Sequence, residues 1–289
     1  MHSSHSESLP VPDAEFPFTW SEFRQIAQLV HSEAGIMLPD SKVNLVYSRL
    51  AKRLRANGLK SFRDYCELVG SAQGVDERQA LISAMTTNVT RFFREQHHFD
   101  LLTKKVLPSL VAAARRGERV RIWSAGCSSG EEPYSIAISL LEIMPDAPSH
   151  DILILATDLD PEMITRGKAG CYTASQVAGI PTSVREKWME KDRQSGTWRM
   201  GADARSLVRF NELNLLQRWP MKGGFDVIFC RNVMIYFDEE TQNGIWSRFA
   251  QLLPQGGYLC IGHSERVSMD RHPFELVAQT AYCKKGGAA

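Results

Sequence analysis

Residues 120–134 read VRIWSAGCSSGEEPY, and this stretch decides the fold. A run of apolar residues ends in small ones around Gly126 and Gly130, and a helical pattern begins directly afterwards. This order predicts a buried strand, a tight turn and a helix, with backbone amides of the turn open to a ligand at the helix N-terminus. Such a turn can also serve only to pack a helix closely against its strand, so the turn by itself leaves both interpretations open.

The region after Gly117 predicts an α/β fold, because short apolar runs alternate with helical spacings as in a parallel sheet built from βαβ units. The polar stretch Cys171–Ser206 is too long for a simple loop and predicts a small inserted subdomain with a hairpin sheet. The predicted strands are Val120–Ser124, Ile152–Thr157, Leu207–Phe210, Phe225–Cys230, Tyr258–Gly262 and a final one through Leu276–Cys283.

The region before Gly117 is helical in pattern. Thr19 and Glu22 have the spacing of a capping box, and apolar residues follow at helical period as far as Gly35. Residues 1–15 lack such a pattern and are expected to form a disordered leader. Further helices are predicted at Ser41–Ala56, from Ser61, within 76–87 and within 95–117. The predicted organisation is a leader (1–15), an all-helical domain (16–90) and an α/β domain (91–289) with a β-subdomain inserted at about 172–206.

The composition excludes several classes of function. The chain has 289 residues, and its 34 Lys and Arg against 33 Asp and Glu give a net charge of +1, so no global charge selects nucleic acid or an anionic membrane. No stretch approaches the roughly 18 apolar residues of a membrane span, and a signal-peptide pattern is missing, which predicts a cytoplasmic protein without membrane insertion. The six cysteines lie far apart without a CxxC pair, which favours reduced core cysteines and no metal site.

Two acids follow the second predicted strand. The segment ILILATD ends on Asp158, and Asp160 precedes a helix that starts at Pro161. A carboxylate at the tip of the second strand is where a bound nucleotide places its ribose hydroxyls, since both hydroxyls can donate to it. Either acid alone is equally well explained as a helix cap.

The fourth predicted strand runs directly into Arg231 and Asn232 within FDVIFCRNVMIYF. Tyr236 and Asn214 are expected to converge on the same edge of the sheet, which is where open α/β sheets bind ligands. A salt-bridged arginine would be the ordinary interpretation of Arg231 alone. The upstream segment TTNVTRFFRE, residues 86–95, has the composition of a lid over a cofactor, although it would serve equally well as a linker.

A serine hydrolase is the rival interpretation, because Gly126–Gly130 also matches the G-x-S-x-G nucleophile elbow with Ser128 as nucleophile. Asp226 and His263 are the acid and base that such an enzyme would use. The long helical region before the elbow argues against it, since an α/β hydrolase has several strands and an oxyanion-hole glycine motif there.

Taken together, the motifs resemble one family. TNVTRFFRE, AGCSSGEEPYSIA, ATDLDPEM, FCRNVMIYFD and GGYLCIGHSE are similar, in order and spacing, to the bacterial chemotaxis receptor methyltransferases of the CheR family, and the resemblance spans about 18–282. It implies a Rossmann-like class I methyltransferase domain with an N-terminal all-helical domain and a small inserted antiparallel β-subdomain. It implies transfer of the methyl group of S-adenosylmethionine to glutamate side chains of chemoreceptor cytoplasmic helices, giving γ-glutamyl methyl esters and S-adenosylhomocysteine. Besides the serine hydrolase, two alternatives are a methyltransferase acting on another substrate and a cofactor-binding module without turnover.

The resemblance also implies roles for single residues. Asn88, Thr90 and Arg94 would cover the cofactor, Asp158 would bind its ribose, and Asn214 with Leu215 would lie on its adenine side. Glu132 is chosen over Glu131 for a further cofactor contact, although the motif does not separate them. Arg231 and Tyr236 would hold the substrate side chain. The predicted catalytic residues are Arg94, Arg231 and Tyr236, and the predicted cofactor residues are Asn88, Thr90, Arg94, Glu132, Asp158, Asn214, Leu215, Arg231 and Asn232.

A basic helix is the candidate for partner recognition. Residues 42–60 hold six basic side chains and no acid, and at roughly 100° per residue Lys42, Arg49 and Arg53 share one side of the helix. This side is either a solvated surface or a docking surface for an acidic receptor helix. Nucleic acid is not expected, because aromatic interleaving is missing. A monomer is the default expectation, and stable binding of a receptor C-terminal peptide by the β-subdomain is not expected.

Overall fold

A computed structural model describes residues 15–286 of the chain, which form two compact units. The helical unit comprises residues 15–87 together with Tyr236–Asp238, and the sheet unit comprises 88–235 with 239–286. The predicted leader, residues 1–15, lies outside the described residues except for Glu15.

The helical unit begins with the predicted capping box, in which the Thr19 side chain and the Glu22 side chain each accept from the other's backbone N–H. The first helix ends at Gly35, whose φ of 69° is the left-handed conformation that glycine adopts without strain. The helices of this unit are α1 (Trp20–Ala34), α2 (Val43–Ala56), α3 (Phe62–Gly70) and α4 (Val75–Met85), with short 3-10 turns η1 (Asp40–Lys42) and η2 (Ala72–Gly74).

The sheet unit contains a seven-stranded sheet in the order β6-β2-β1-β7-β8-β10-β9. Strands β6, β2, β1, β7 and β8 run parallel, and β10 is antiparallel to both of its neighbours. The strand order reverses at β1, so the crevice at the carboxyl ends of β1 and its neighbours is the place where such a sheet binds ligands. The strands are β1 (Val120–Ala125), β2 (Ile152–Asp158), β6 (Val208–Glu212), β7 (Val227–Cys230), β8 (Tyr258–Ile261), β9 (Phe274–Ala278) and β10 (Ala281–Lys284).

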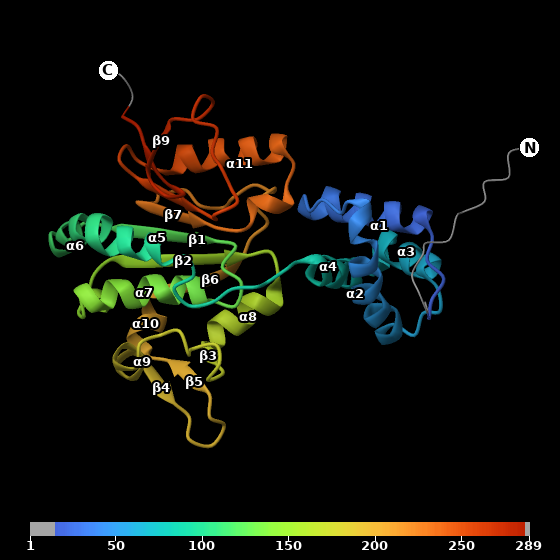
Figure 1. The fold of residues 1–289 in the computed structure, drawn as a ribbon, viewed down its shortest axis with the longest axis horizontal. Coiled ribbons are helices and arrows are strands. Elements are labelled where there is room, and N and C mark those ends of the chain that lie inside the picture. The colour runs from blue at the N-terminus through green and yellow to red at the C-terminus, as the bar shows by residue number, and fades with distance from the viewer. Residues whose placement is uncertain (1–14, 287–289) are drawn as a thin grey trace, which may run out of the picture. The chain divides into compact units, whose positions relative to one another are not determined.

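Helices cover both faces of this sheet, and Figure 1 shows α7 and α11 on opposite sides of it. On the α11 face the Trp123 ring packs against Phe249 at 5.2 Å between centroids, and on the other face Ser124 contacts α7. No helix of the described residues is long and apolar enough to cross a membrane. The helical elements are α5 (Gln96–Leu101), a π-helical turn η3 (Leu102–Val106), α6 (Leu107–Arg115), α7 (Glu131–Ile143), η4 (Ala147–Ser149), α8 (Pro161–Ala169), α9 (Thr182–Trp188), α10 (Ala202–Leu207), η5 (Met234–Tyr236) and α11 (Glu239–Leu252).

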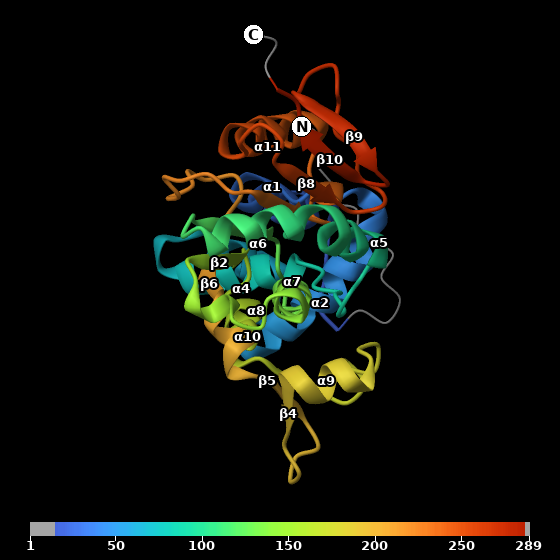
Figure 2. The same ribbon diagram turned by 90° about the vertical axis from the view of Figure 1, so that its left-hand side faces the viewer.

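The predicted inserted subdomain is present as a second, three-stranded antiparallel sheet in the order β3-β5-β4. Its strands are β3 (Cys171–Tyr172), β4 (Met189–Lys191) and β5 (Trp198–Met200), and Figure 2 shows it with α9 projecting from the rest of the sheet unit. The predicted class, an α/β fold with a helical domain and a small antiparallel insert, is confirmed.

The prediction of one final strand through Leu276–Cys283 was wrong. The chain instead forms β9 and β10, which pair antiparallel. Thr280 lies between them with a φ of 51°, a left-handed conformation that is uncommon for a β-branched residue. Because no Gly or Pro marks this turn, the sequence pattern runs through it without a break.

Two helical glycines give a test of how tightly α8 packs on the sheet. A Cβ at Gly167 of α8 would overlap the Phe210 ring of β6, whereas a Cβ at Gly244 of α11 would meet nothing. We expect Gly167→Ala to lower the free energy of unfolding by about 1–3 kcal/mol through overpacking. The matched change Gly244→Ala should raise it by about 0.5–1 kcal/mol. Denaturant unfolding measures both, and an unchanged or raised stability of Gly167→Ala would contradict the packing.

Candidate functional site

The turn after β1 is held against the tips of its neighbouring strands. Gly126 and Gly130 have φ angles of 80° and 97°, and Ser128 between them has 48°. The backbone N–H groups of Gly126 and Cys127 donate to the carbonyl oxygen of Thr157. A Cβ at Gly126 would overlap the Val233 side chain, so the turn also lies close to the segment that follows β7.

Asp158 at the tip of β2 and Asp160 have different roles. The Asp158 carboxylate accepts the backbone N–H of Ser128 at 2.7 Å and that of Asp160 at 3.0 Å. Burial raises the pKa of the Asp158 carboxyl, although these two hydrogen bonds oppose the rise. Asp160 caps α8 by accepting the N–H of Glu162, and it also accepts from the Asn88 side chain at 2.9 Å. Asp160 is therefore the helix cap, and Asp158 remains as the acid of the strand tip.

Arg231 forms the centre of a buried ion-pair network. Its side chain is 2 % exposed; Nη1 donates to Glu132 Oε2 at 2.8 Å, and Nη2 lies 3.3 Å from Glu95 Oε2. Nη2 also donates to the carbonyl oxygen of Arg94, and Ser124 donates to the other oxygen of Glu132 at 2.7 Å. The network thus connects the tip of β7, the start of α7 and the segment before α5.

Glu131 and Glu132 point to different surroundings. Glu131 accepts from the Ser129 hydroxyl at 2.7 Å and from the Gln176 amide at 3.1 Å, which belongs to the inserted part of the chain. Glu132 faces Arg231. The choice of Glu132 over Glu131 for a cofactor contact stays a prediction.

The segment 88–95, which we call the strap, is attached to the turn after β1. The Asn88 carbonyl oxygen accepts from the Ser128 hydroxyl at 3.0 Å, and the Phe93 N–H donates to Ser135 of α7 at 2.9 Å. Arg94 is half-buried, as is Thr90, and Arg94 Nη1 donates to the carbonyl oxygen of Val89. Phe93 and Glu95 both have positive φ. Strained backbone of this kind persists where surrounding contacts fix it, and it is concentrated at functional sites.

Glu95 joins the ion-pair network to two histidines. The pKa of the Glu95 carboxyl lies below its usual range: burial would raise it, but the Arg231 guanidinium together with hydrogen bonds from His263 outweighs burial. His98 Nδ1 lies 3.6 Å from Glu95 Oε2, and His263 Nδ1 lies 3.1 Å from Oε1. Ligand atoms of Glu95, His97 and His98 also fall within 4.8 Å of one another. The expectation of no metal site stays a prediction.

Asn232 is held by a carboxylate that the sequence analysis did not select. The Asn232 N–H donates to Glu265 Oε2 at 3.0 Å, and Asn232 itself has a φ of 59°. Glu265 is 5 % exposed. Both Glu265 and Glu95 occur in motifs of the sequence, GHSE and FFRE, but a single acid in a loop is more often a surface residue.

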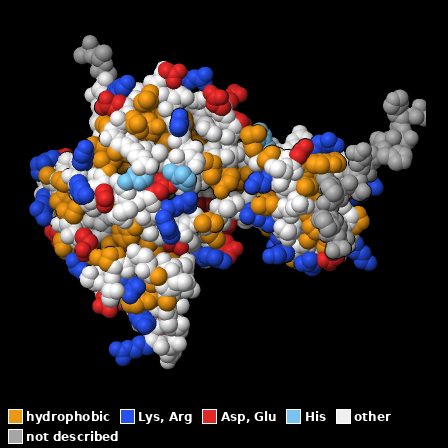
Figure 3. Space-filling view, in the orientation of Figure 1, with side chains coloured by type: hydrophobic (Ala, Val, Ile, Leu, Met, Phe, Trp, Pro, Cys, Tyr) orange, Lys and Arg blue, Asp and Glu red, His pale blue; other side chains and the backbone are white. Residues whose placement is uncertain are grey.

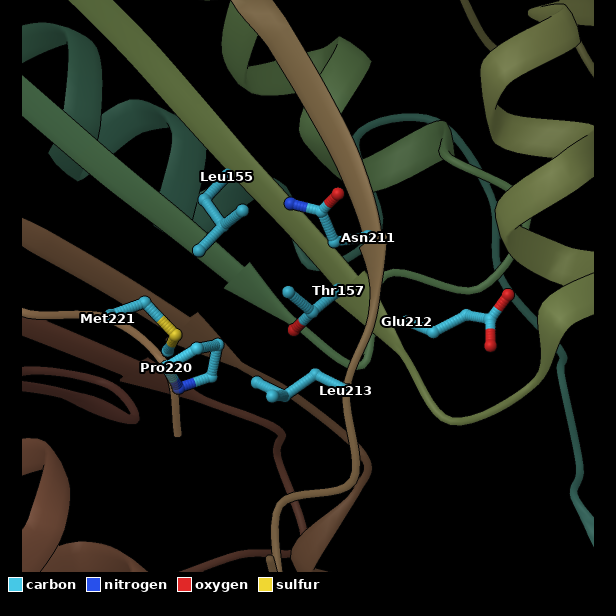
Figure 4. A pocket seen from close by; sticks show the side chains of 7 residues that line it. All are labelled: Leu155, Thr157, Asn211, Glu212, Leu213, Pro220 and Met221. Atoms are coloured by element: carbon cyan, nitrogen blue, oxygen red, sulfur yellow. The ribbon is translucent and has the colours of Figure 1, made fainter. Parts of the chain in front are cut away.

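A small cavity borders the tip of β2 on the α11 face. Figure 4 shows Leu155 and Thr157 of β2 facing Pro220 and Met221, while the Glu212 carboxylate points away from them. Leu213 lines the cavity and donates its N–H to the Asp158 carbonyl oxygen at 2.9 Å. Asn214 and Leu215 follow it directly; Asn214 Oδ1 accepts from the Leu216 N–H, and Leu215 is buried. The predicted adenine-side residues thus adjoin a largely apolar cavity.

The hydrolase triad is not assembled. Asp226 accepts the backbone N–H of Arg121 at the amino end of β1, whereas Ser128 lies beyond its carboxyl end. His263 instead pairs with Glu95, and Ser128 donates to the Asn88 carbonyl oxygen. Tyr236 belongs to the helical unit, where its carbonyl oxygen accepts from the Met37 N–H, so its predicted role beside Arg231 stays a prediction.

The basic helix α2 uses two of its predicted docking residues inside the helical unit. Arg53 donates twice to Glu77, at 2.9 and 2.5 Å, and Arg49 donates to the carbonyl oxygens of Ala84 and Thr86. Lys42 is exposed. Figure 3 shows further Lys and Arg side chains over the surface of the helical unit.

The comparisons with known proteins match both units. A family model described as "CheR methyltransferase, SAM binding domain" matches residues 88–283, and one described as "CheR methyltransferase, all-alpha domain" matches residues 21–86. A probable chemotaxis protein methyltransferase of Rhizobium etli is 51% identical over 88% of this chain and 96% of its own length. The chemotaxis protein methyltransferases of Salmonella typhimurium and Escherichia coli are each 41% identical over 91% of this chain, covering 89% and 90% of their own lengths.

The buried His98 gives a prediction about acid stability. Burial, followed by the nearby Arg231 guanidinium, lowers the pKa of His98 to about 3, whereas an unfolded histidine titrates near about 6.5. The unfolded chain therefore binds the proton first as pH falls, and stability is lost below about pH 6.5. Between about pH 7.5 and pH 5, His98 should account for a loss of about 2 kcal/mol.

Denaturant unfolding of the wild type and of His98→Gln at about pH 7.5 and pH 5 measures the contribution of His98 to this loss. The variant should lose less stability on acidification than the wild type. His31→Gln is the control: this side chain is 51% exposed and its pair with Asp238 lies at the surface, where such pairs contribute little, so the variant should lose nearly as much stability on acidification as the wild type. If His98→Gln loses as much stability on acidification as the wild type, the group responsible for the loss is not His98.

Proposed function

Because the chain belongs to the CheR methyltransferase family, we propose that it methylates glutamate side chains of chemoreceptors. It is an S-adenosylmethionine-dependent methyltransferase of chemotaxis. The single observation that carries the choice of site is the buried acid and arginine array at the carboxyl edge of β1, β2 and β7, where a doubly wound sheet binds its ligand.

The charge of this array suits a cationic cofactor. Among the described residues, the buried charged side chains of the sheet unit are Arg231 and the acids Glu131, Glu132, Asp158, Asp160 and Glu265. Hydrogen bonds solvate these carboxylates but leave their net negative charge in place, and this charge favours a ligand that brings positive charge. S-adenosylmethionine brings a sulfonium and an ammonium group, and when bound it supplies the activated methyl group.

The proposed cofactor residues form three groups according to the part of the cofactor that they would contact. We propose that Asp158 accepts from the ribose hydroxyls and that Asn214 and Leu215, beside the apolar cavity, lie on the adenine side. Asn88, Thr90 and Arg94 of the strap would cover the cofactor, since the strap is already bonded to the turn through Ser128. Glu132 and Asn232 would complete the site on the side of β7.

The proposed chemistry requires no general base. A glutamate carboxylate has an ordinary pKa of about 4.3 and is already ionised at neutral pH, so the nucleophile needs no deprotonation. Water stabilises the charged reactants more than a transition state in which their charges are being neutralised, so the site must align the carboxylate and exclude solvent. Such alignment can contribute roughly 7–11 kcal/mol in favourable cases.

Arg94, Arg231 and Tyr236 are the proposed catalytic residues. Arg231 is occupied by two carboxylates, so a substrate carboxylate reaches it only when a pair opens, and the pair with Glu95 at 3.3 Å is the longer one. Arg94 is only half-buried and has its guanidinium bonded to a nearby carbonyl oxygen, which leaves further N–H groups for a carboxylate.

Docking is proposed on α2 and on the end of η1 just before it, with the acidic helices of a chemoreceptor cytoplasmic domain as the partner. Lys42 is the exposed member of the predicted set, while Arg49 and Arg53 first stabilise the helical unit. Attraction of this kind accelerates encounter and weakens with salt. The monomeric state, the cytoplasmic location and the weak binding of a receptor C-terminal peptide stay predictions.

Carboxyl methylation has a direct assay. We expect the chain, incubated with S-[methyl-³H]adenosylmethionine and chemoreceptor-containing membranes, to label the receptor with tritium that alkali releases as methanol. Membranes incubated without the chain give the background. Label that survives alkali would indicate nitrogen or ether methylation and would contradict the proposed substrate group.

Asp158 gives a test of the proposed ribose contact. Asp158→Ala removes a charged acceptor, and such hydrogen bonds are worth about 1.5–3 kcal/mol, so the Kd for S-adenosylhomocysteine should rise about ten- to hundredfold. The control is Asp151→Ala, an exposed acid just before the amino end of the same strand, which should leave the Kd unchanged. Isothermal titration calorimetry measures both, and a wild-type Kd for Asp158→Ala would remove the ribose assignment.

A further inference from the structure

Glu265 accepts four backbone hydrogen bonds at the carboxyl edge of the sheet. Oε1 accepts the N–H groups of Val233 and Met234, each at 2.8 Å. Oε2 accepts those of Asn232 at 3.0 Å and Gly262 at 2.5 Å. The side chain is 5 % exposed, so these four donors replace the water that would otherwise solvate the carboxylate.

The four donors come from two neighbouring strands. Asn232, Val233 and Met234 follow β7, and Gly262 follows β8. Three successive N–H groups aimed at one anion form the concave arrangement known as a nest. The carboxylate therefore connects two strand tips that β-sheet hydrogen bonds no longer join.

The segment that Glu265 holds is the one that borders the proposed cofactor site. Asn232 has a φ of 59°, a conformation that costs energy in a residue with a side chain. A Cβ at Gly262 would come within 2.7 Å of the Asn232 backbone nitrogen, so the two tips already touch. Val233 lies against Gly126 of the turn after β1. Movement of this segment would thus reach both the turn and Arg231 beside it.

We propose that Glu265 is a positioning residue for cofactor binding, because its carboxylate fixes the backbone of residues 232–234 at the edge of the site. This proposal rests on the proposed function. Glu265 touches backbone only, so it acts through Asn232 and the turn rather than on the cofactor.

The test is the affinity of the full chain for S-adenosylhomocysteine, measured by isothermal titration calorimetry below the melting temperature of each variant. Glu265→Gln replaces one acceptor oxygen by an NH₂ group that faces backbone N–H groups, and the Kd should rise by about tenfold or more. The matched control is Asp226→Asn, which alters a carboxylate that bridges β7 and β1 at the opposite edge of the sheet and should keep the wild-type Kd.

A double variant distinguishes positioning from a general loss of stability. If Glu265 acts by fixing the backbone that places the Asn232 side chain, the increase in Kd of Glu265→Gln/Asn232→Ala should be clearly smaller than the product of the two separate increases, because the first change already displaces the side chain that the second removes. A Kd equal to the product of the two separate effects would overturn the proposal. Glu265→Asp keeps the carboxylate with a shorter reach and should give an intermediate Kd; a Kd equal to that of the wild type would also overturn it.

The two proposals fail separately. A wild-type chain that does not bind S-adenosylhomocysteine would contradict the proposed cofactor site itself. A wild-type chain that binds, together with a Glu265→Gln variant that binds equally well, would contradict only the role of Glu265.

Discussion

The site depends on the pairing of one buried guanidinium. Arg231 is almost fully enclosed, and a buried charge of this kind is tolerated only when neighbouring groups compensate it. Glu132 supplies one compensation from the first turn of α7, and Glu95 supplies the other from the end of the strap. The tip of β7, the first turn of α7 and the end of the strap are remote in sequence. They come together so that Arg231, Glu132 and Glu95 are all paired. The positive φ angles of Phe93 and Glu95 are conformations that this arrangement has to hold in place.

In the proposed mechanism, the same pairing would let the site take up a positively charged donor and then a negatively charged acceptor. Two carboxylates around one guanidinium leave an excess of negative charge, which favours a sulfonium compound. In the proposed mechanism, an incoming carboxylate would replace Glu95 in the longer of the two pairs with Arg231. A fully accessible arginine would bind the nucleophile in the absence of the cofactor and lower its reactivity, so a guanidinium that is already paired is better suited to aligning a carboxylate.

Much of the fold was predictable from the sequence, because buried parallel strands and helical periods leave local patterns. The remaining features depend on contacts between distant residues. Glu132 lies 99 residues from Arg231, and nothing in the sequence near either one indicates the other. Arg53 belongs to a basic helix face, but its partner Glu77 is on another helix. Glu265 is a loop acid by sequence and a buried acceptor in the structure. The turn at Thr280 was missed because a β-branched residue occupies a position where glycine is usual.

A crystal structure of the full chain with S-adenosylhomocysteine tests the central claim most directly. The nucleoside should lie along the carboxyl ends of β1 and β2, with a ribose hydroxyl within hydrogen-bonding distance of Asp158 and with Arg231 still bonded to Glu132. A ligand bound elsewhere on the chain, or an Arg231 side chain that leaves Glu132 to hold the ligand, would contradict it.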